Sequence, residues 1–143
     1  MPRFLLDTNI CIYITKQQPP EVLARFKRLA PGDVAMSVVT WGELAFGAEK
    51  SRESARARDA LSKLADLIPV LPMDARVGEQ YGKIRAALEY IGRPIGNNDL
   101  WIAAHALAEG IVLVTNNEAE FSRVPALRVV NWTSSGVRRG PGG

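Results

Sequence analysis

Short apolar runs that alternate with longer amphipathic stretches constrain the fold of this chain more than any other feature. Three runs, at 3–6, 34–36 and 111–114, are typical of buried strands, and the last is the clearest because its apolar residues are unbroken. Shorter extended segments are expected at 68–71 and 128–130. Strands separated by helices indicate right-handed βαβ crossovers. We therefore predict a three-layer α/β fold, with a central parallel sheet of four to five short strands flanked by helices.

The stretches between these runs carry helical spacing and residues that begin or end helices. Asp74 can cap a long helix, which Gly92 and Pro94 would end. Apolar residues recur at helical spacing in the segment 21–29, between the Pro19-Pro20 and Pro31-Gly32 breaks. The predicted helices cover 10–15, 21–29, 37–49, 52–67, 75–90 and 100–109.

Length and composition fit one compact domain. The chain has 143 residues, of which 47% are apolar and 23% charged, enough to bury a core. We predict a single domain over residues 1–133 and a disordered tail, rich in Gly and Ser, at 134–143. Lys and Arg together outnumber Asp and Glu by 18 to 15. If several acids gather in one cleft, the remaining surface must be basic, which suits a polyanionic substrate.

The single cysteine and the apolar segments bear on the cellular compartment. Cys11 cannot form an intrachain disulfide, and we expect a buried small side chain rather than a nucleophile. No segment reaches the roughly 18 apolar residues of a membrane span. We therefore expect a cytoplasmic protein with no membrane partner.

Four acids, Asp7, Glu43, Asp99 and Glu120, lie shortly after predicted strands or near the start of the next helix. In an open α/β sheet the carboxyl ends of the strands are where ligands bind, so these side chains are expected to meet at one edge. Clustered carboxylates repel one another unless a hard cation such as Mg²⁺ neutralises them. The pattern indicates a metal-dependent phosphodiesterase.

Each acid also has a simpler explanation. Asp7 can be an Asx-turn residue, Asp99 an N-cap, and Glu43 the partner of Thr40 in a capping box. Capping does not explain why the acids follow successive strands at one sheet edge. Glu120 is the weakest member, because Glu118 or Asn117 can take its place.

Motifs at several places follow one order from about Arg3 to Trp132. The first two are Leu5-Leu6-Asp7-Thr8-Asn9 and Thr40-Trp41-Gly42-Glu43-Leu44 with Gly47-Ala48. The third is Ile95-Gly96-Asn97-Asn98-Asp99, which leads into Ile102-Ala103-Ala104-His105-Ala106. The last two are Val114-Thr115-Asn116-Asn117 with Glu120-Phe121, and the stretch 121–127 followed by Asn131-Trp132. Together they resemble the PIN domain, and more narrowly the VapC toxins of bacterial toxin-antitoxin pairs. The combination is far more specific than any single motif.

The resemblance implies a PIN-like fold and a Mg²⁺- or Mn²⁺-dependent endoribonuclease, the toxin of a type II toxin-antitoxin system. Such relatives cut structured RNA, either transfer or ribosomal, and so inhibit translation. A VapB-like antitoxin would fill the groove beside the acids, and the chain is expected to form a homodimer. Many relatives carry an Asp where Asn117 stands. Glu120 matches an acid of similar relatives and is expected to serve instead.

The chemistry of these side chains also predicts a mechanism. Asp7, Glu43 and Asp99 would hold one hydrated divalent ion, while Glu120 would complete a second, weaker site. The ion lowers the pKa of its water, and the resulting hydroxide attacks the phosphate in line. Nearby hydroxyl and amide groups can orient ligands or waters, although turn and cap roles are equally open. These supporting residues are Thr8, Asn9, Thr115, Asn116 and Asn117.

Other functional groups carry weaker predictions. Arg85 can reach a phosphate, although a solvated helix face is the more common role. His105 lies nearly two turns beyond the acid at 99 and is expected to face the core. Trp41, Trp101 and Tyr90 can stack on RNA bases, but core positions are favoured for all three.

Three other functions are alternatives to a metal-dependent nuclease. A haloacid-dehalogenase-like phosphatase needs a second Asp two residues after the first, where this chain has Asn9. A receiver domain needs a Lys after a late strand, and the segment after 111–114 has none. The remaining alternative is a catalytically inactive PIN-like RNA-binding module, which Asn117 keeps open. Mg²⁺-dependent cutting of RNA separates the two, because an inactive module binds without cleaving.

Overall fold

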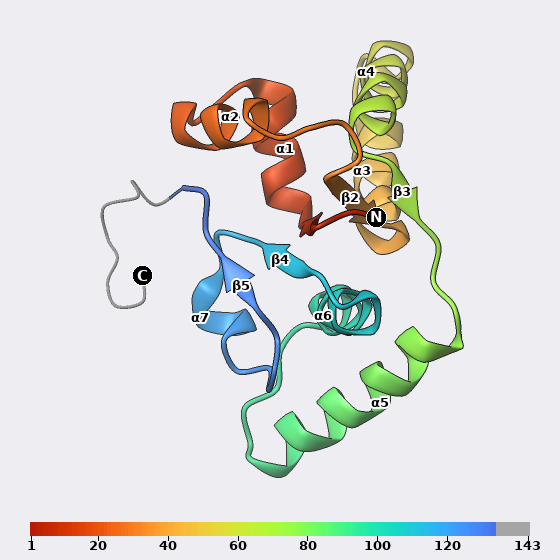
Figure 1. Ribbon diagram of the computed structural model, residues 1–143. Helices are drawn as coiled ribbons and strands as arrows, with labels where there is room; N and C mark the ends of the chain where they lie inside the picture. The colour runs from red at the N-terminus through yellow and green to blue at the C-terminus, as the bar shows by residue number, and fades with distance from the viewer. Residues whose placement is uncertain (134–143) are drawn as a thin grey trace.

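The computed structural model describes residues 1–133, and the tail predicted at 134–143 lies outside the described residues. A central sheet carries helices on its two sides (Figure 1). All the expected strands and helices form, and their ends differ from the expected ones by at most three residues. The elements are β1 (Phe4–Leu6), α1 (Thr8–Lys16), α2 (Pro20–Lys27), β2 (Val34–Ser37), α3 (Val38–Lys50), α4 (Ser54–Leu67), β3 (Val70–Leu71), α5 (Ala75–Tyr90), α6 (Asn97–Glu109), β4 (Val112–Val114), α7 (Glu118–Phe121) and β5 (Val129–Val130).

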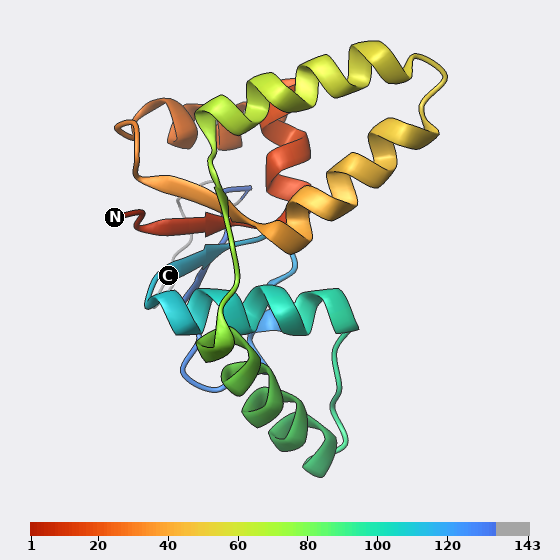
Figure 2. The ribbon, with the colours of Figure 1, turned by 90° about the vertical axis from the view of Figure 1, so that its right-hand side faces the viewer.

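The sheet of the described chain is parallel throughout, with strand order β3-β2-β1-β4-β5. β1 lies at its centre, where Phe4 pairs with Val34 of β2 and Val112 of β4. Figure 2 shows α5 and α6 on one side of the sheet and α1, α3 and α4 on the other. The predicted three-layer α/β fold is confirmed, and all strand carboxyl ends share one edge.

Two apolar cores hold the layers together, one on each face of the sheet. Successive residues of a strand point to opposite faces, so Leu5 packs with α5 and α6 while Leu6 packs with α1 and α4. Ile102 fills the first core and Ile10 the second, and both are fully buried. The strand ends are therefore fixed from both sides, which gives the segments that follow them a rigid base.

The structure corrects two expectations about helix starts. α3 is capped by Ser37, whose Oγ accepts a hydrogen bond from Val39 N at 3.1 Å. Thr40 and Glu43 therefore lie inside the helix, and the capping box is wrong. α6 begins at Asn97, so Asp99 is in its first turn rather than at its N-cap.

Two buried polar residues behave as predicted. Cys11 is a free, buried thiol on α1. His105 is 0% exposed, and its Nδ1 lies 2.9 Å from the Ser37 hydroxyl. In the part of the chain that the structure describes, no helix has the length and apolar character needed to cross a membrane.

Candidate functional site

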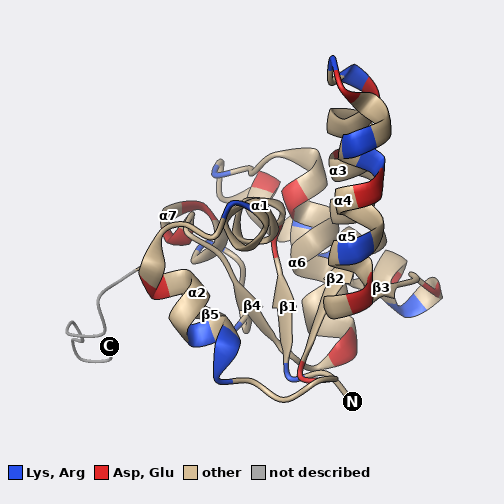
Figure 3. Cartoon of the chain, turned by 90° about the horizontal axis from the view of Figure 1, so that it is seen from above, with Lys and Arg blue, Asp and Glu red and all other residues tan. Residues whose placement is uncertain are grey.

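The four acids come from four different segments, three of which directly follow strands. Asp7 ends β1 and caps α1, Glu43 lies on α3 after β2, Asp99 is on α6, and Glu120 is on α7 after β4. Asp99 experiences the charges of the other three, which places all four near one another at the carboxyl edge. Many lysines and arginines lie away from this edge, for example on α2 and α4 (Figure 3), whereas Arg123 lies near Glu120. The sequence-based grouping of the acids is thus reproduced in space.

Asp7 is the most deeply placed acid, with 6% of its surface exposed. Its backbone N–H donates to Val114 O at 3.0 Å, and its Oδ1 accepts from Ile10 N at 3.0 Å. Burial raises the pKa of this carboxyl, the charge of Glu43 adds to the rise, and a hydrogen bond from Thr115 opposes it. A cation would relieve both causes, because each of them disfavours the negative charge.

Glu43 is held by neighbours of two other acids. The Thr8 hydroxyl donates to its Oε1, and Asn98 Nδ2 donates to its Oε2 at 3.0 Å. Thr8 follows Asp7 in sequence and Asn98 precedes Asp99, so each donor is anchored beside an acid. Asn98 was not predicted as a site residue; a polar side chain next to a candidate ligand in the first turn of a helix was the available signal.

Asp99 and Glu120 form a hydrogen-bonded carboxyl pair. Glu120 also accepts from Gly96 N at 3.0 Å and from Asn117 Nδ2 at 2.7 Å. Burial and the contact with Glu120 raise the pKa of Asp99 to about 7, while the same hydrogen bond lowers the pKa of Glu120. The proton that this pair binds is therefore held more tightly than a proton on an isolated carboxyl group.

The three candidates for the fourth acidic position separate clearly in space. Glu120 bonds to Asp99, and Asn117 donates to Glu120. Glu118 turns away and accepts from Asn131 Nδ2 at 2.8 Å. The geometry thus favours Glu120 as the fourth acid, with Asn117 as the residue that orients it.

The oxygen-rich group has the chemistry of a divalent-cation site. Among residues 1–133 none of the four acids forms an ion pair with Lys or Arg. Arg123 lies close enough to lower the pKa of Glu120, but its Nη1 donates to Pro94 O at 2.9 Å. Hard carboxylate oxygens without cationic partners are the ligands that Mg²⁺ prefers. Among residues 1–133, no three acidic, His or Cys side chains lie close enough together to form a complete metal-binding group.

The remaining supporting residues fall into two sets. Thr115 is buried, bonds to Asp7, and accepts from Asn117 N at 2.9 Å. Asn116 donates to Tyr13 OH at 2.8 Å and accepts from Asn9 Nδ2 at 3.5 Å. The first set touches the acids directly, whereas Asn9 and Asn116 bond to each other at the rim.

The aromatic residues differ from one another in burial. Trp41 and Trp101 are partly buried and pack against the two cores, as expected. Tyr81 stacks on Trp101 with a centroid separation of 3.9 Å. Tyr90 is 92% exposed, so its predicted core position is wrong. It is the last residue of α5.

Comparison with known proteins identifies the family. Residues 4–127 match the PIN domain. The tRNA(fMet)-specific endonuclease VapC of Shigella flexneri is 44% identical over 133 residues, 93% of this chain and 100% of that relative. Ribonuclease VapC2 of Haemophilus influenzae is 42% identical over 132 residues, 92% of this chain and 99% of that relative. The solved structure of VapBC-1 from nontypeable Haemophilus influenzae has a TM-score of 0.85 and 41% identity, covering 92% of this chain and 98% of that one. This chain therefore belongs to the PIN domain family, in its VapC branch.

Proposed function

We propose that this VapC ribonuclease is a toxin that cuts transfer RNA with the help of Mg²⁺ or Mn²⁺, and that Asp7, Glu43, Asp99 and Glu120 carry the reaction. The supporting observation is the group of four acids at one sheet edge, without an ion-paired cation among the described residues. Transfer RNA is the substrate class in the name of the Shigella flexneri relative. We also propose that the protein acts in the cytoplasm.

The position of each residue assigns its role in metal binding. Asp7, Glu43 and Asp99 would hold the ion, and Thr8 and Asn98 fix the direction of the Glu43 carboxylate. When bound, a divalent ion supplies Lewis-acid activation of water and neutralises charge that develops on the phosphate.

We assign proton transfer to Glu120, the partner of Asp99 in the carboxyl pair. The Glu120 carboxylate can take up a proton from the attacking water. Gly96 N and Asn117 hold Glu120 toward Asp99, so the acceptor has a fixed direction.

Control by a VapB-like antitoxin is part of the proposal. A groove of about 610 Å³ runs between α1, α3 and α4, and its walls include Ile12, Leu44, Leu61 and Leu64. Leu44 is next to Glu43, so a partner helix in this groove could extend a basic residue toward the acids. The solved VapBC-1 complex supports a partner of this kind. Purification with the product of the adjacent gene tests the complex, and light scattering tests the expected homodimer.

The test of the proposed activity compares two matched variants on transfer RNA with Mg²⁺. Asp7→Asn should bind RNA but lose roughly 10²-fold or more in cleavage, because the amide keeps the shape and removes the charge. Asp66→Asn changes an exposed acid on α4 and should cut normally. The inactive RNA-binding alternative predicts binding without cutting for every form, including the unaltered protein.

A further inference from the structure

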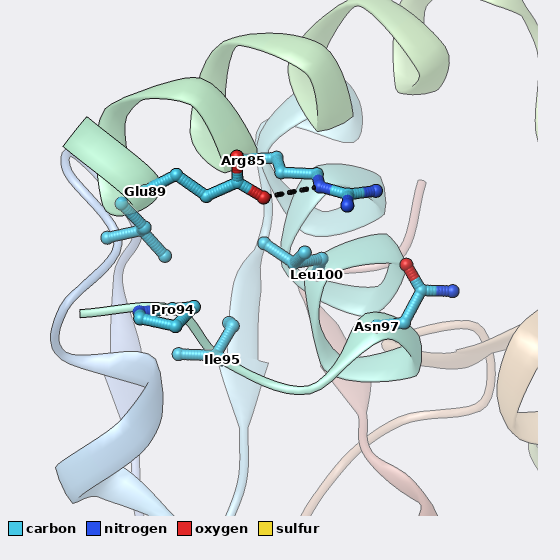
Figure 4. Close-up of a pocket in the computed structure, with 7 residues that line it drawn as sticks. Arg85, Glu89, Pro94, Ile95, Asn97 and Leu100 are labelled. Atoms are coloured by element: carbon cyan, nitrogen blue, oxygen red, sulfur yellow. Dashed lines mark hydrogen bonds and ion pairs between the residues drawn. The ribbon is translucent and has the colours of Figure 1, made fainter. Parts of the chain in front are cut away.

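A small cavity lies between α5, the start of α6 and the segment that connects these two helices. Its volume is about 180 Å³. Figure 4 shows Arg85 and Glu89 of α5 over Leu100, with Pro94 and Ile95 on the opposite side and Asn97 at one end. The complete lining is Arg85, Leu88, Glu89, Pro94, Ile95, Asn97 and Leu100.

The cavity has an apolar floor and a polar rim. Leu88, Ile95 and Leu100 are buried at the floor, whereas Arg85 and Asn97 are exposed at the rim. Floors of this kind bind flat apolar faces, and a few polar groups at the rim fix the orientation of the bound group. A volume of about 180 Å³ is below the roughly 300 Å³ at which drug-sized pockets begin. The space therefore suits one small planar group rather than a whole nucleotide.

Hydrogen bonds hold the rim in place and leave donors available. Arg85 Nε donates to Glu89 Oε2 at 2.8 Å, and its Nη1 donates to Tyr81 OH at 2.9 Å. The Tyr81 hydroxyl donates to Asn97 Oδ1 at 2.6 Å. The Asn97 oxygen is thereby used, while its amide N–H groups and Arg85 Nη2 have no partner among the described residues. The rim thus presents hydrogen-bond donors to an acceptor on the ligand.

One backbone segment separates this cavity from the acids. Gly96 lies between Ile95 and Asn97, which line the cavity. A Cβ on Gly96 would lie 3.8 Å from Asp99 Oδ2 and 4.0 Å from Glu120 Oε2, so its other side faces the carboxyl pair. A ligand that spans both places needs only to cross the width of one chain, on the order of 5 Å.

We propose that this cavity binds one unpaired base of the RNA, next to the phosphate that is cut. The inference rests on the proposed function and assigns a substrate-binding role to Arg85 and Asn97. RNA loops offer unstacked bases whose faces are apolar and whose edges carry acceptors. The base lies against Leu88, Ile95 and Leu100, and its acceptor edge meets the donors of the rim. Guanine fits well, because its O6 and N7 are both acceptors.

The test measures binding in the Asp99→Asn background, so that cleavage does not interfere. Short single-stranded RNA oligonucleotides carry 2-aminopurine, and in a second set an abasic nucleotide, at each position in turn. One position should change in fluorescence on binding, and an abasic nucleotide there should raise the Kd about tenfold. Arg85→Gln and Asn97→Ala should remove both effects. Arg56→Gln, an exposed arginine on α4 that pairs with Glu53, should preserve them.

Two results would overturn the assignment. The first is an unchanged response to base removal in Arg85→Gln and Asn97→Ala, with circular dichroism showing that both variants are folded. The second is weaker antitoxin binding by Arg85→Gln with an intact response to RNA. That result would indicate that the cavity binds the protein partner and not an RNA base. Failure of the unaltered protein to cut RNA would count against the proposed function alone, because the binding data would still decide what the cavity holds.

Discussion

Asp99→Asn should stabilise the metal-free protein at pH 8 while abolishing cleavage. The folded-state pKa of Asp99 is raised from 3.8 to about 7, so the folded protein binds this proton more tightly than the unfolded chain does. The penalty for ionising Asp99 is absent below about pH 4, grows as the pH rises, and is complete above about pH 7. An amide carries no charge, so the Asp99→Asn variant is free of this destabilisation.

The structure bounds the size of this effect. A rise from 3.8 to about 7 corresponds to at most about 4 kcal/mol, at 1.36 kcal/mol for each pKa unit. Asp99 is only half-buried, so solvent screening reduces the expected gain to about 1–2 kcal/mol. The Asn amide can still donate to Glu120, as the protonated Asp99 does. For a domain of this size the gain is worth several degrees in Tm.

Denaturant unfolding in EDTA at pH 5 and pH 8 measures the effect. The unaltered protein should lose stability between the two conditions relative to Asp99→Asn, and Mg²⁺ should then stabilise the unaltered protein but not the variant. Asp66→Asn serves as the control for an acid-to-amide change on an exposed helix. If Asp99→Asn is less stable than the unaltered protein at pH 8 in EDTA, the carboxylate crowding inferred here is wrong.

Further predictions concern residues around the site and in the core. Asn98→Ala should lower kcat by roughly 10- to 100-fold with little change in Tm, because Glu43 loses one of two hydrogen-bond donors; steady-state kinetics with unchanged kcat would contradict this. Cys11 should react with a thiol reagent only in denaturant, because burial and then the charge of Asp7 raise the pKa of its thiol; reaction of the native protein at pH 8 would contradict this. Ser37→Ala should cost about 1–3 kcal/mol in unfolding experiments, because it removes both the α3 cap and the partner of His105; an unchanged midpoint would contradict this.

The strands and the long helices could be predicted from the sequence because their signals are local. Ile111–Val114 is an unbroken apolar run, and α5 has Asp74 as its cap and Gly92 beyond its end. The grouping of Asp7, Glu43 and Glu120 followed from topology, since every strand of a parallel sheet ends at the same edge. Asp99 joins them from the first turn of α6, the helix that leads into β4. These features do not depend on which side chains meet across the fold.

The parts that were missed depend on contacts between distant segments. The bond from Asn98 to Glu43 joins α6 to α3, and no sequence pattern encodes it. Tyr90 is an aromatic residue of the kind often found in cores, yet it lies exposed at the last position of α5. The choice of Glu120 over Glu118 depended on the direction in which a single helical turn faces.

End-group analysis of cleaved RNA, with and without EDTA, tests the central claim most directly. Water activated by a divalent ion does not need the ribose 2′-hydroxyl as its nucleophile, so cleavage should leave 5′-phosphate and 3′-hydroxyl ends. EDTA should stop the reaction, Mg²⁺ or Mn²⁺ should restore it, and Asp99→Asn should remain inactive throughout. Products with 2′,3′-cyclic phosphate ends that persist in EDTA would contradict the assignment of these four acids as a metal-dependent nuclease site.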